Sequence, residues 1–185
     1  MDRTSSGEPT FSTVLAQATQ GDGRAFEHIF SAYAGRIRAF AIARGARDPD
    51  AIANDVMLQV FRSLGSFDGD ESAFVRWLFR IARNRLIDAY RADQRRPIIA
   101  DAAVPESAAR SAEAVVFDNL SLADVAERLS RLTVDQREVI SLRLIQDLSL
   151  KDVALIVDRP VTAVKALQRR GMEALRRQIL EEEVS

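Results

Sequence analysis

Positive charge in this sequence is concentrated in two stretches. Residues 74–97 contain seven arginines and two aspartates, a net charge of about +5, and residues 161–180 contain five basic side chains and one acidic one, about +4. The whole 185-residue chain has a net charge of −1. Because basic side chains neutralise phosphates, two local concentrations indicate a polyanion bound at two places. The alternative for either stretch alone is a solvated helix face.

The second basic stretch predicts the end of a helix-turn-helix, with a helix over 150–157, the turn VDRP, and a helix over 161–180. A helical wheel separates the last helix into two sides. The polar side carries Thr162, Lys165, Ala166, Arg169, Arg170, Arg176 and Arg177. The packing side carries Val161, Val164, Leu167, Gly171, Met172, Leu175 and Ile179. Such a helix can pack by one side and enter a major groove by the other, although an ordinary helical hairpin with a charged outer face has the same pattern.

The first half of the chain contains two further faces of interest. A helix over 51–64 is expected to have a broad buried side that includes Ala51 and Phe61. Its opposite side brings together an amide, an acid, a leucine and an arginine: Asn54, Asp55, Leu58 and Arg62. This set is a candidate docking patch, and a single unburied leucine is the alternative. A helix over 72–96 places Arg76, Arg80, Arg83 and Arg91 on a stripe, with Asn84 at its margin. Trp77 is expected to pack against the core.

The elements that hold these residues are all predicted to be helices, because three- and four-residue apolar spacing recurs and strand signals are absent. Residues 1–10 are expected to be a disordered tail, 11–96 one helical domain, 97–112 a flexible linker and 113–185 a second helical domain. Helices are expected over 11–19, 24–45 and 113–129, and over 134–146 in the second domain. Asp50 is the expected cap of helix 51–64, and Thr133–Gln136 and Ser149–Asp152 are expected capping boxes.

Composition argues against several function classes. The chain has no cysteine and one histidine, so thiolate chemistry, histidine-based metal sites and a histidine-dependent triad are not expected. Clustered acids or a nucleophile–base pair are not found either, so we expect no enzyme, no catalytic residues, no metal and no cofactor. No apolar run reaches about 18 residues, and the polar start does not suggest a signal peptide, so we expect no membrane insertion and a cytoplasmic protein.

Two long motifs resemble a known family. Region two of the sigma-70-type bacterial transcription initiation factors is similar to DPDAIANDVMLQVFRSLGSFDGDESAFVRWLFRIARNRLIDAYRADQRR, and region four is similar to LSRLTVDQREVISLRLIQDLSLKDVALIVDRPVTAVKALQRRGMEALRRQI. The presence of only these two regions resembles the extracytoplasmic-function (ECF) subgroup. The resemblance implies a dissociable sigma factor that binds the clamp helices and flap of core RNA polymerase, promoter DNA and an anti-sigma factor.

The resemblance also assigns residues to roles. Asn54 and Asp55 match the amide–acid pair of the clamp-docking helix, beside Leu58 and Arg62. The loop with Phe67, Asp68 and Gly69 matches the loop that holds a flipped base of the −10 element. The implied −10 face consists of Arg76, Arg80, Arg83, Asn84, Arg85, Arg91, Arg95 and Arg96. The implied −35 recognition helix presents Thr162, Lys165, Ala166, Arg169 and Arg170.

This sequence departs from the family pattern at three places. The usual LVQE reads IAND, the turn glycine is Asp158, and the usual VKSRLHR reads VKALQRR. Asp158 can adopt a left-handed conformation, and Ala166 can contact a thymine methyl. A stand-alone helix-turn-helix transcriptional regulator remains the alternative function; it predicts duplex binding without polymerase and a palindromic site.

Overall fold

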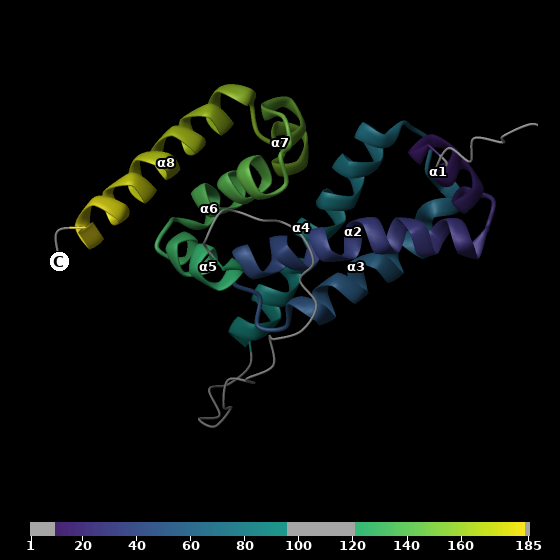
Figure 1. The fold of residues 1–185 in the computed structure, drawn as a ribbon, viewed down its shortest axis with the longest axis horizontal. Coiled ribbons are helices and arrows are strands. Elements are labelled where there is room, and N and C mark those ends of the chain that lie inside the picture. Colours follow the sequence, from purple (N-terminus) through teal and green to yellow (C-terminus); the bar gives the residue numbers. More distant parts are fainter. Residues whose placement is uncertain (1–9, 96–120, 184–185) are drawn as a thin grey trace, which may run out of the picture.

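The computed structural model describes residues 10–95 and 121–183, and all of its regular structure is helical. The expected linker 97–112 and residues 1–9 of the expected tail lie outside these ranges. The elements, in chain order, are α1 (Phe11–Thr19), α2 (Gly23–Ala43), α3 (Pro49–Ser63), the 3₁₀ turn η1 (Leu64–Ser66), α4 (Glu71–Arg95), α5 (Leu122–Ser130), α6 (Val134–Ile140), the π-helical turn η2 (Ser141–Ile145), α7 (Leu150–Val157) and α8 (Val161–Glu183). The expected all-α fold is confirmed (Figure 1). None of the described helices is long and apolar enough to cross a bilayer.

Side-chain caps fix the starts of the first helices. Thr10, expected in the tail, caps α1, and the Asp22 carboxylate accepts from the first backbone N–H groups of α2. The expected cap at Asp50 is wrong, because Asp48 accepts from the Ala51 N–H at 2.8 Å. Pro49 therefore occupies the first turn of α3, where its missing N–H leaves no hydrogen bond unmade.

The C-terminal helices follow the expected caps in part. The Thr133–Gln136 capping box is present. Ser149 caps α7, but the Asp152 carboxylate accepts from the Ser149 hydroxyl and from a distant arginine, so the reciprocal bond of the expected second box is absent. The expected helix over 134–146 ends early as α6 and continues as the wider turn η2, because the Gln146 N–H reaches back five residues to the Ser141 carbonyl.

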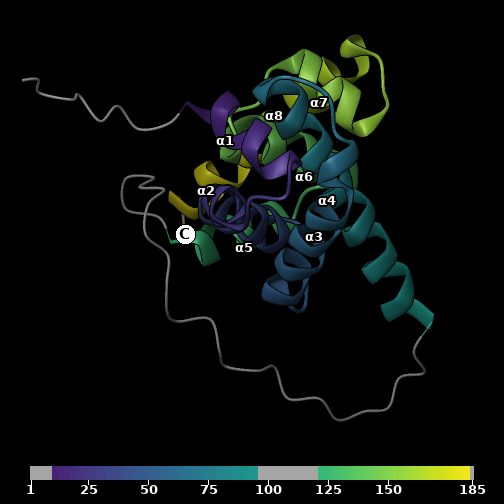
Figure 2. The ribbon, with the colours of Figure 1, turned by 90° about the vertical axis from the view of Figure 1, so that its right-hand side faces the viewer.

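The N-terminal unit (residues 10–95) is a bundle in which α2 and α3 lie side by side and α4 packs against both (Figure 1). Aromatic rings fill its centre: Tyr33 and Phe74 meet nearly edge to face at 5.4 Å between ring centroids, and Phe40 and Phe79 do so at 5.6 Å. Burial and the nearby Glu71 carboxylate raise the pKa of Tyr33 to about 12. The last turns of α4 project beyond the other helices (Figure 2).

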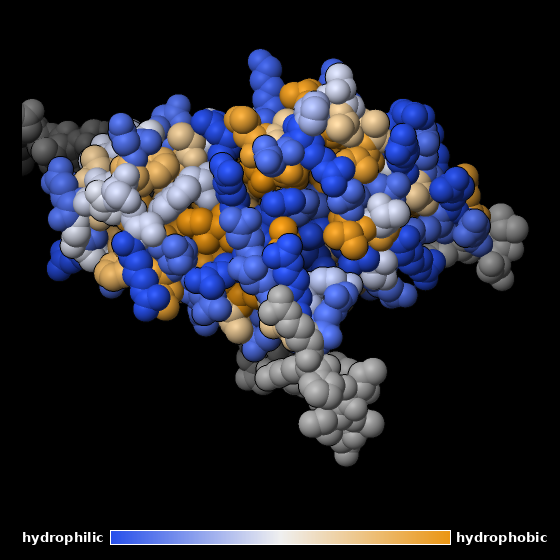
Figure 3. Space-filling model, turned by 180° about the vertical axis from the view of Figure 1, so that it is seen from behind, coloured by the Kyte–Doolittle hydropathy of each residue, from blue (hydrophilic) through white to orange (hydrophobic). Residues whose placement is uncertain are grey.

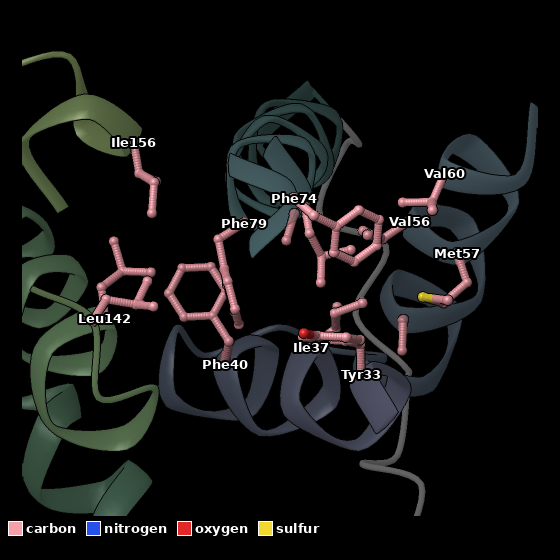
Figure 4. Close-up of a cluster of buried hydrophobic side chains, with 14 of the residues drawn as sticks. Tyr33, Ile37, Phe40, Val56, Met57, Val60, Phe74, Phe79, Leu142 and Ile156 are labelled. Carbon is pink, nitrogen blue, oxygen red and sulfur yellow. The ribbon is translucent and has the colours of Figure 1, made fainter. Parts of the chain in front are cut away.

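The C-terminal unit (residues 121–183) packs directly on the N-terminal unit. Helix α5 lies on α2, and α7 lies on α4. Figure 4 shows Leu142 and Ile156 facing Phe40 and Phe79, and all four side chains are at most 2% exposed. The sequence predicts two separate domains and gives no signal for this contact, because the apolar side chains that form it also fit the interior of either unit.

Candidate polymerase-docking and nucleic-acid surfaces

The candidate docking patch on α3 lies on the surface. Asn54, Asp55, Leu58 and Arg62 are all exposed. The expected burial of Ala51 and Phe61 is wrong, since both are exposed. The Phe61 side chain is 57% exposed although its ring meets Phe26 at 4.8 Å. Phe61 lies three residues after Leu58. Residues at this spacing are neighbours on a helix, so the sequence contained the signal that puts Phe61 on the same face as Leu58.

Other large apolar side chains are also exposed. Figure 3 shows one face of the molecule, on which orange hydrophobic patches are interrupted by blue hydrophilic side chains. Across the described residues, the exposed set outside α3 is Phe30, Tyr90, Val134, Leu144, Leu155, Met172, Ile179 and Leu180.

The loop before α4 is held by ring packing and by a glycine. The Phe67 ring lies 5.0 Å from Trp77 and 5.7 Å from Phe74, while Asp68 is exposed. This contact confirms the expected packing of Trp77. Gly69 has φ +155°, and a Cβ there would lie 2.9 Å from the Ala73 Cβ. A side chain at Gly69 therefore requires both backbone strain and local displacement.

The basic stripe of α4 divides into two sets. Arg80, Asn84 and Arg91 are exposed. Arg85 donates to Gln59 Oε1 at 3.2 Å. Arg76 contacts Ser72 and donates to Asp152 Oδ1 at 2.9 Å, and Arg83 donates to Glu138 Oε2 at 3.3 Å. Two arginines of the expected stripe are therefore paired with acids of the C-terminal unit. The side chain of Arg95, and Arg96 as a whole, lie outside the described residues.

The helix-turn-helix has the expected elements and turn. Asp158 ends α7 with φ 55° and ψ 53°, so the left-handed conformation expected at this position is confirmed. Arg159 then pairs with Asp135 at 2.8 Å, which ties the turn to the start of α6. The Pro160 carbonyl accepts from the N–H groups of Ala163 and Val164, so α8 begins directly after the proline. The turn is thus fixed both by backbone conformation and by an ion pair.

The polar side of α8 faces solvent. Thr162, Lys165, Arg169 and Arg170 are exposed, whereas Ala166 is half-buried. Arg169 pairs with Glu173 one turn along at 2.9 Å. The wheel is wrong for Met172 and Ile179, which are 44% and 46% exposed, and it missed Gln178, which is buried. The covered stripe of α8 consists of Gly171, Ala174, Leu175 and Gln178, so Met172 and Ile179 lie at the uncovered edge of the apolar side.

Gly171 is the close-contact point between α8 and α6. A Cβ at this position would lie 2.9 Å from Ile140 Cγ1. A glycine inside a helix is unfavourable by itself, so its place here is explained by the approach of the two helices. The described residues include no group of three side chains suited to hold a metal ion.

Comparison with known proteins identifies both units. Residues 29–96 match the family model for Sigma-70 region 2, and residues 128–177 match that for Sigma-70, region 4. The ECF RNA polymerase sigma factor SigW of Bacillus subtilis is 30% identical over 186 residues, which span 89% of this chain and 94% of SigW. The chain belongs to the ECF sigma factors. It is therefore a non-enzymatic subunit that directs RNA polymerase in promoter recognition.

Two further comparisons extend across both regions of this sigma factor. The ECF RNA polymerase sigma factor BldN of Streptomyces coelicolor is 26% identical over 168 residues, 89% of this chain and 64% of BldN. The structure of CnrH in complex with the cytosolic domain of CnrY matches with a TM-score of 0.67 at 27% identity, covering 93% of this chain and 97% of CnrH. We refer to residues 11–95 as region 2 and to residues 121–183 as region 4.

Proposed function

We propose that this sigma factor binds core polymerase through α3, captures the melted −10 element with α4 and reads the −35 element as duplex with α8. The proposal is carried mainly by the exposure of the first turns of α8, directly after the helix-turn-helix turn. Thr162, Lys165 and Arg169 are exposed there and would reach base edges, while the later, also exposed arginines would reach phosphates. The half-buried methyl of Ala166 is suited to a thymine methyl at the edge of the contact.

Docking is assigned to the patch of Asn54, Asp55, Leu58, Phe61 and Arg62. Two exposed apolar side chains surrounded by polar ones resemble the centre and rim of a protein interface. Clamp helices of the largest polymerase subunit are the partner that the sequence motif implies. The polymerase flap is the corresponding partner for region 4. As a polymerase subunit, the protein would act in the cytoplasm.

Capture of the −10 strand is assigned to the loop with Phe67, Asp68 and Gly69 and to the basic residues of α4. The exposed set Arg80, Asn84 and Arg91 offers donors for a single strand. The outer basic residues Arg95 and Arg96 are assigned to the DNA backbone on the motif alone. The proposed domain boundaries are those of the sequence: 11–96, 97–112 and 113–185.

An anti-sigma factor is a proposed regulatory partner. CnrH was solved with the cytosolic domain of CnrY bound. A protein that covers Leu58 and Phe61 here would compete with core polymerase for the same patch. The expected result is mutually exclusive binding of the two partners in a titration; a ternary complex would contradict it.

The test of the function is promoter selection by reconstituted holoenzyme. Core polymerase with this chain is incubated with a library of random promoter-length duplexes, and the sequences of run-off transcripts are determined. The expected result is one promoter class with two separated elements, transcribed only when both chain and core enzyme are present. Selection of a palindromic site by the chain alone would instead favour a stand-alone regulator.

A further inference from the structure

The contact between region 2 and region 4 contains a set of polar bonds besides its apolar centre. Arg36 of α2 donates to Gln146 Oε1 at 3.2 Å and to the Gln146 carbonyl at 3.0 Å, and Gln146 donates back to the Arg36 carbonyl at 3.1 Å. Arg44 donates to the Val134 carbonyl at 2.8 Å. Each of these bonds joins residues that are 90 or 110 positions apart in the sequence.

Glu138 is the charged centre of this contact. Its side chain is 6% exposed, and its carboxylate lies between two arginines of region 2, 3.2 Å from Arg44 Nη2 and 3.3 Å from Arg83 Nε. Arg44 and the Glu138 carboxylate form an ion pair, but their geometry is not that of a hydrogen bond. Burial lowers the pKa of Arg44, and the Glu138 charge opposes that shift. A buried carboxylate is tolerated in such a place only while its cationic partners remain against it.

Asp152 forms a second charged contact at the edge of the interface. It lies in the first turn of α7, and its carboxylate pairs with Arg76 of α4 at 2.9 Å. Burial raises the pKa of Asp152, but hydrogen bonds from Ser149 and Arg76 lower it further, so the net shift is downward. The carboxylate is therefore ionised at neutral pH and complements Arg76 fully.

The two DNA elements cannot be bound in this arrangement. Elements at −35 and −10 lie about 25 nucleotides apart, which is roughly 85 Å along duplex DNA at about 3.4 Å per step. Helix α4 packs against α7, and α7 leads within one turn into α8. A helix as long as α4 spans only about 38 Å at 1.5 Å per residue. Region 4 must leave α4 before both elements can be contacted.

We propose that Glu138 and Asp152 form an ionic latch that holds the free sigma factor closed, with region 4 carboxylates occupying Arg83 and Arg76 in place of promoter DNA. The identity of those arginines as strand contacts rests on the proposed function; the latch itself rests on the ion pairs. When region 4 leaves region 2, Arg76 and Arg83 would exchange their carboxylate partners for DNA phosphates. The same two arginines would then stabilise both the closed and the open state. The docking patch on α3 carries none of these bonds, so polymerase can bind the closed form.

The latch can be measured without DNA. The chain has no cysteine, so Ala51→Cys and Met172→Cys, both exposed, accept one spin label each in region 2 and region 4. Double electron–electron resonance then gives the distance distribution between the regions. We expect a single short distance in the otherwise unchanged chain, and a second, longer population in Glu138→Gln/Asp152→Asn. The matched control is Glu127→Gln/Glu173→Gln, which removes the same charge from two exposed pairs inside region 4, Glu127–Arg131 and Glu173–Arg169.

A charge exchange tests the Arg76–Asp152 contact separately. Asp152→Arg places like charges together, which we expect to raise the ratio of open to closed chains at least tenfold, since such contacts typically cost several kcal/mol. The exchange Arg76→Asp with Asp152→Arg should restore the short distance. Circular dichroism on every variant separates opening from unfolding. Restoration by the exchange supports the latch, and failure of both acid variants to lengthen the distance overturns it.

DNA binding by the free chain links the latch to function. The probe is a pool of random single-stranded DNA, because phosphate contacts dominate such binding. Only open chains are expected to bind the probe, so the apparent affinity for DNA is proportional to the open fraction. A latch variant should therefore bind the probe more tightly by the same factor as its open fraction increases. Longer distances with unchanged DNA affinity would support the latch and overturn the assignment of Arg76 and Arg83 to the −10 strand. A free chain that is already open would overturn the latch and leave that assignment intact.

Discussion

The two basic surfaces of this sigma factor differ in what neutralises them. On α4, Arg83 is bonded to a buried acid of region 4 and its side chain is 24% exposed. On α8, Arg169 is 68% exposed and pairs only with the similarly exposed Glu173 of its own helix among the bonds described. An exposed pair one turn apart contributes about 0.3–0.5 kcal/mol, so a phosphate displaces it easily. The surface proposed to read duplex DNA is therefore accessible, whereas part of the surface proposed to capture the single strand is occupied by ion pairs.

The net charge of a stretch of sequence therefore does not measure how much of its surface is available for binding. The two basic stretches have net charges of about +5 and +4, which look equivalent in sequence. The accessibility of the first stretch depends on acids more than 50 residues away in the chain, such as Glu138 for Arg83, whereas Arg169 in the second pairs within its own helix. The third surface, on α3, is open like α8. Polymerase docking and −35 reading therefore precede full −10 contact in our proposal.

The largest effect is expected from reversing charge in the open docking patch. Asp55→Arg should weaken binding to core polymerase about a hundredfold or more, because like charge at a docking face costs several kcal/mol. The measurement is a titration with core enzyme. Asp88→Arg is the control, since Asp88 is an exposed acid on α4 outside the patch. Equal affinities for the two variants would remove Asp55 from the docking surface.

The open α8 surface should separate base readers from phosphate contacts. Lys165→Ala or Arg169→Ala should relax preference at one base pair of the −35 element by roughly 1–3 kcal/mol. Arg177→Ala, near the end of α8, should weaken all sequences alike and reduce the salt slope by about one. The measurement is binding of holoenzyme to a set of single-base −35 variants. Uniform weakening by the first two changes would mean that they hold the backbone and that the recognition register is wrong.

On α4, we expect Arg83→Ala and Asn84→Ala each to reduce the rate of promoter opening about tenfold. For Arg83, this is the size of effect expected from the loss of one hydrogen bond to a charged group. The defect should be larger on duplex promoter than on a pre-melted template, and duplex binding by region 4 should persist. Asn84 lies outside the latch, whereas Arg83 lies within it, so only Arg83→Ala should also lengthen the distance between the regions. Equal transcription defects on both templates would argue against a role in melting.

Sequence reasoning predicted the helices, the turn at Asp158 and the exposure of the docking residues, because these depend on local spacing and capping. It placed Phe61 and Met172 inside, because a wheel assigns burial by residue type and does not show which part of the apolar side a neighbouring helix covers. It assigned Asp152 only to a local capping box with Ser149, whereas the carboxylate accepts both from the Ser149 hydroxyl and, across the molecule, from Arg76. The paired state of the α4 stripe is a tertiary property, and periodicity carries no information about it.

The smallest effect is expected from two helical glycines, one on a free face and one at a contact. Gly35 lies exposed in α2, where an added Cβ has nothing within 4 Å. Gly35→Ala should stabilise the protein by about 0.5–1 kcal/mol, because alanine favours helix over the unfolded chain. For a chain of this size that raises Tm by roughly 1–4 °C.

Gly171→Ala has the same intrinsic gain but meets Ile140 Cγ1 at 2.9 Å. Ile140 is buried and β-branched, so it has little room to move, and overpacking of this kind costs about 1–3 kcal/mol. The cost equals or exceeds the helical gain, and Tm should stay constant or fall. Thermal unfolding of the two variants side by side measures the difference. A rise as large as that of Gly35→Ala would mean that α6 and α8 are not held at this separation. The proposed base-reading turns of α8 would then lack the rigid support that this contact with α6 is expected to give them.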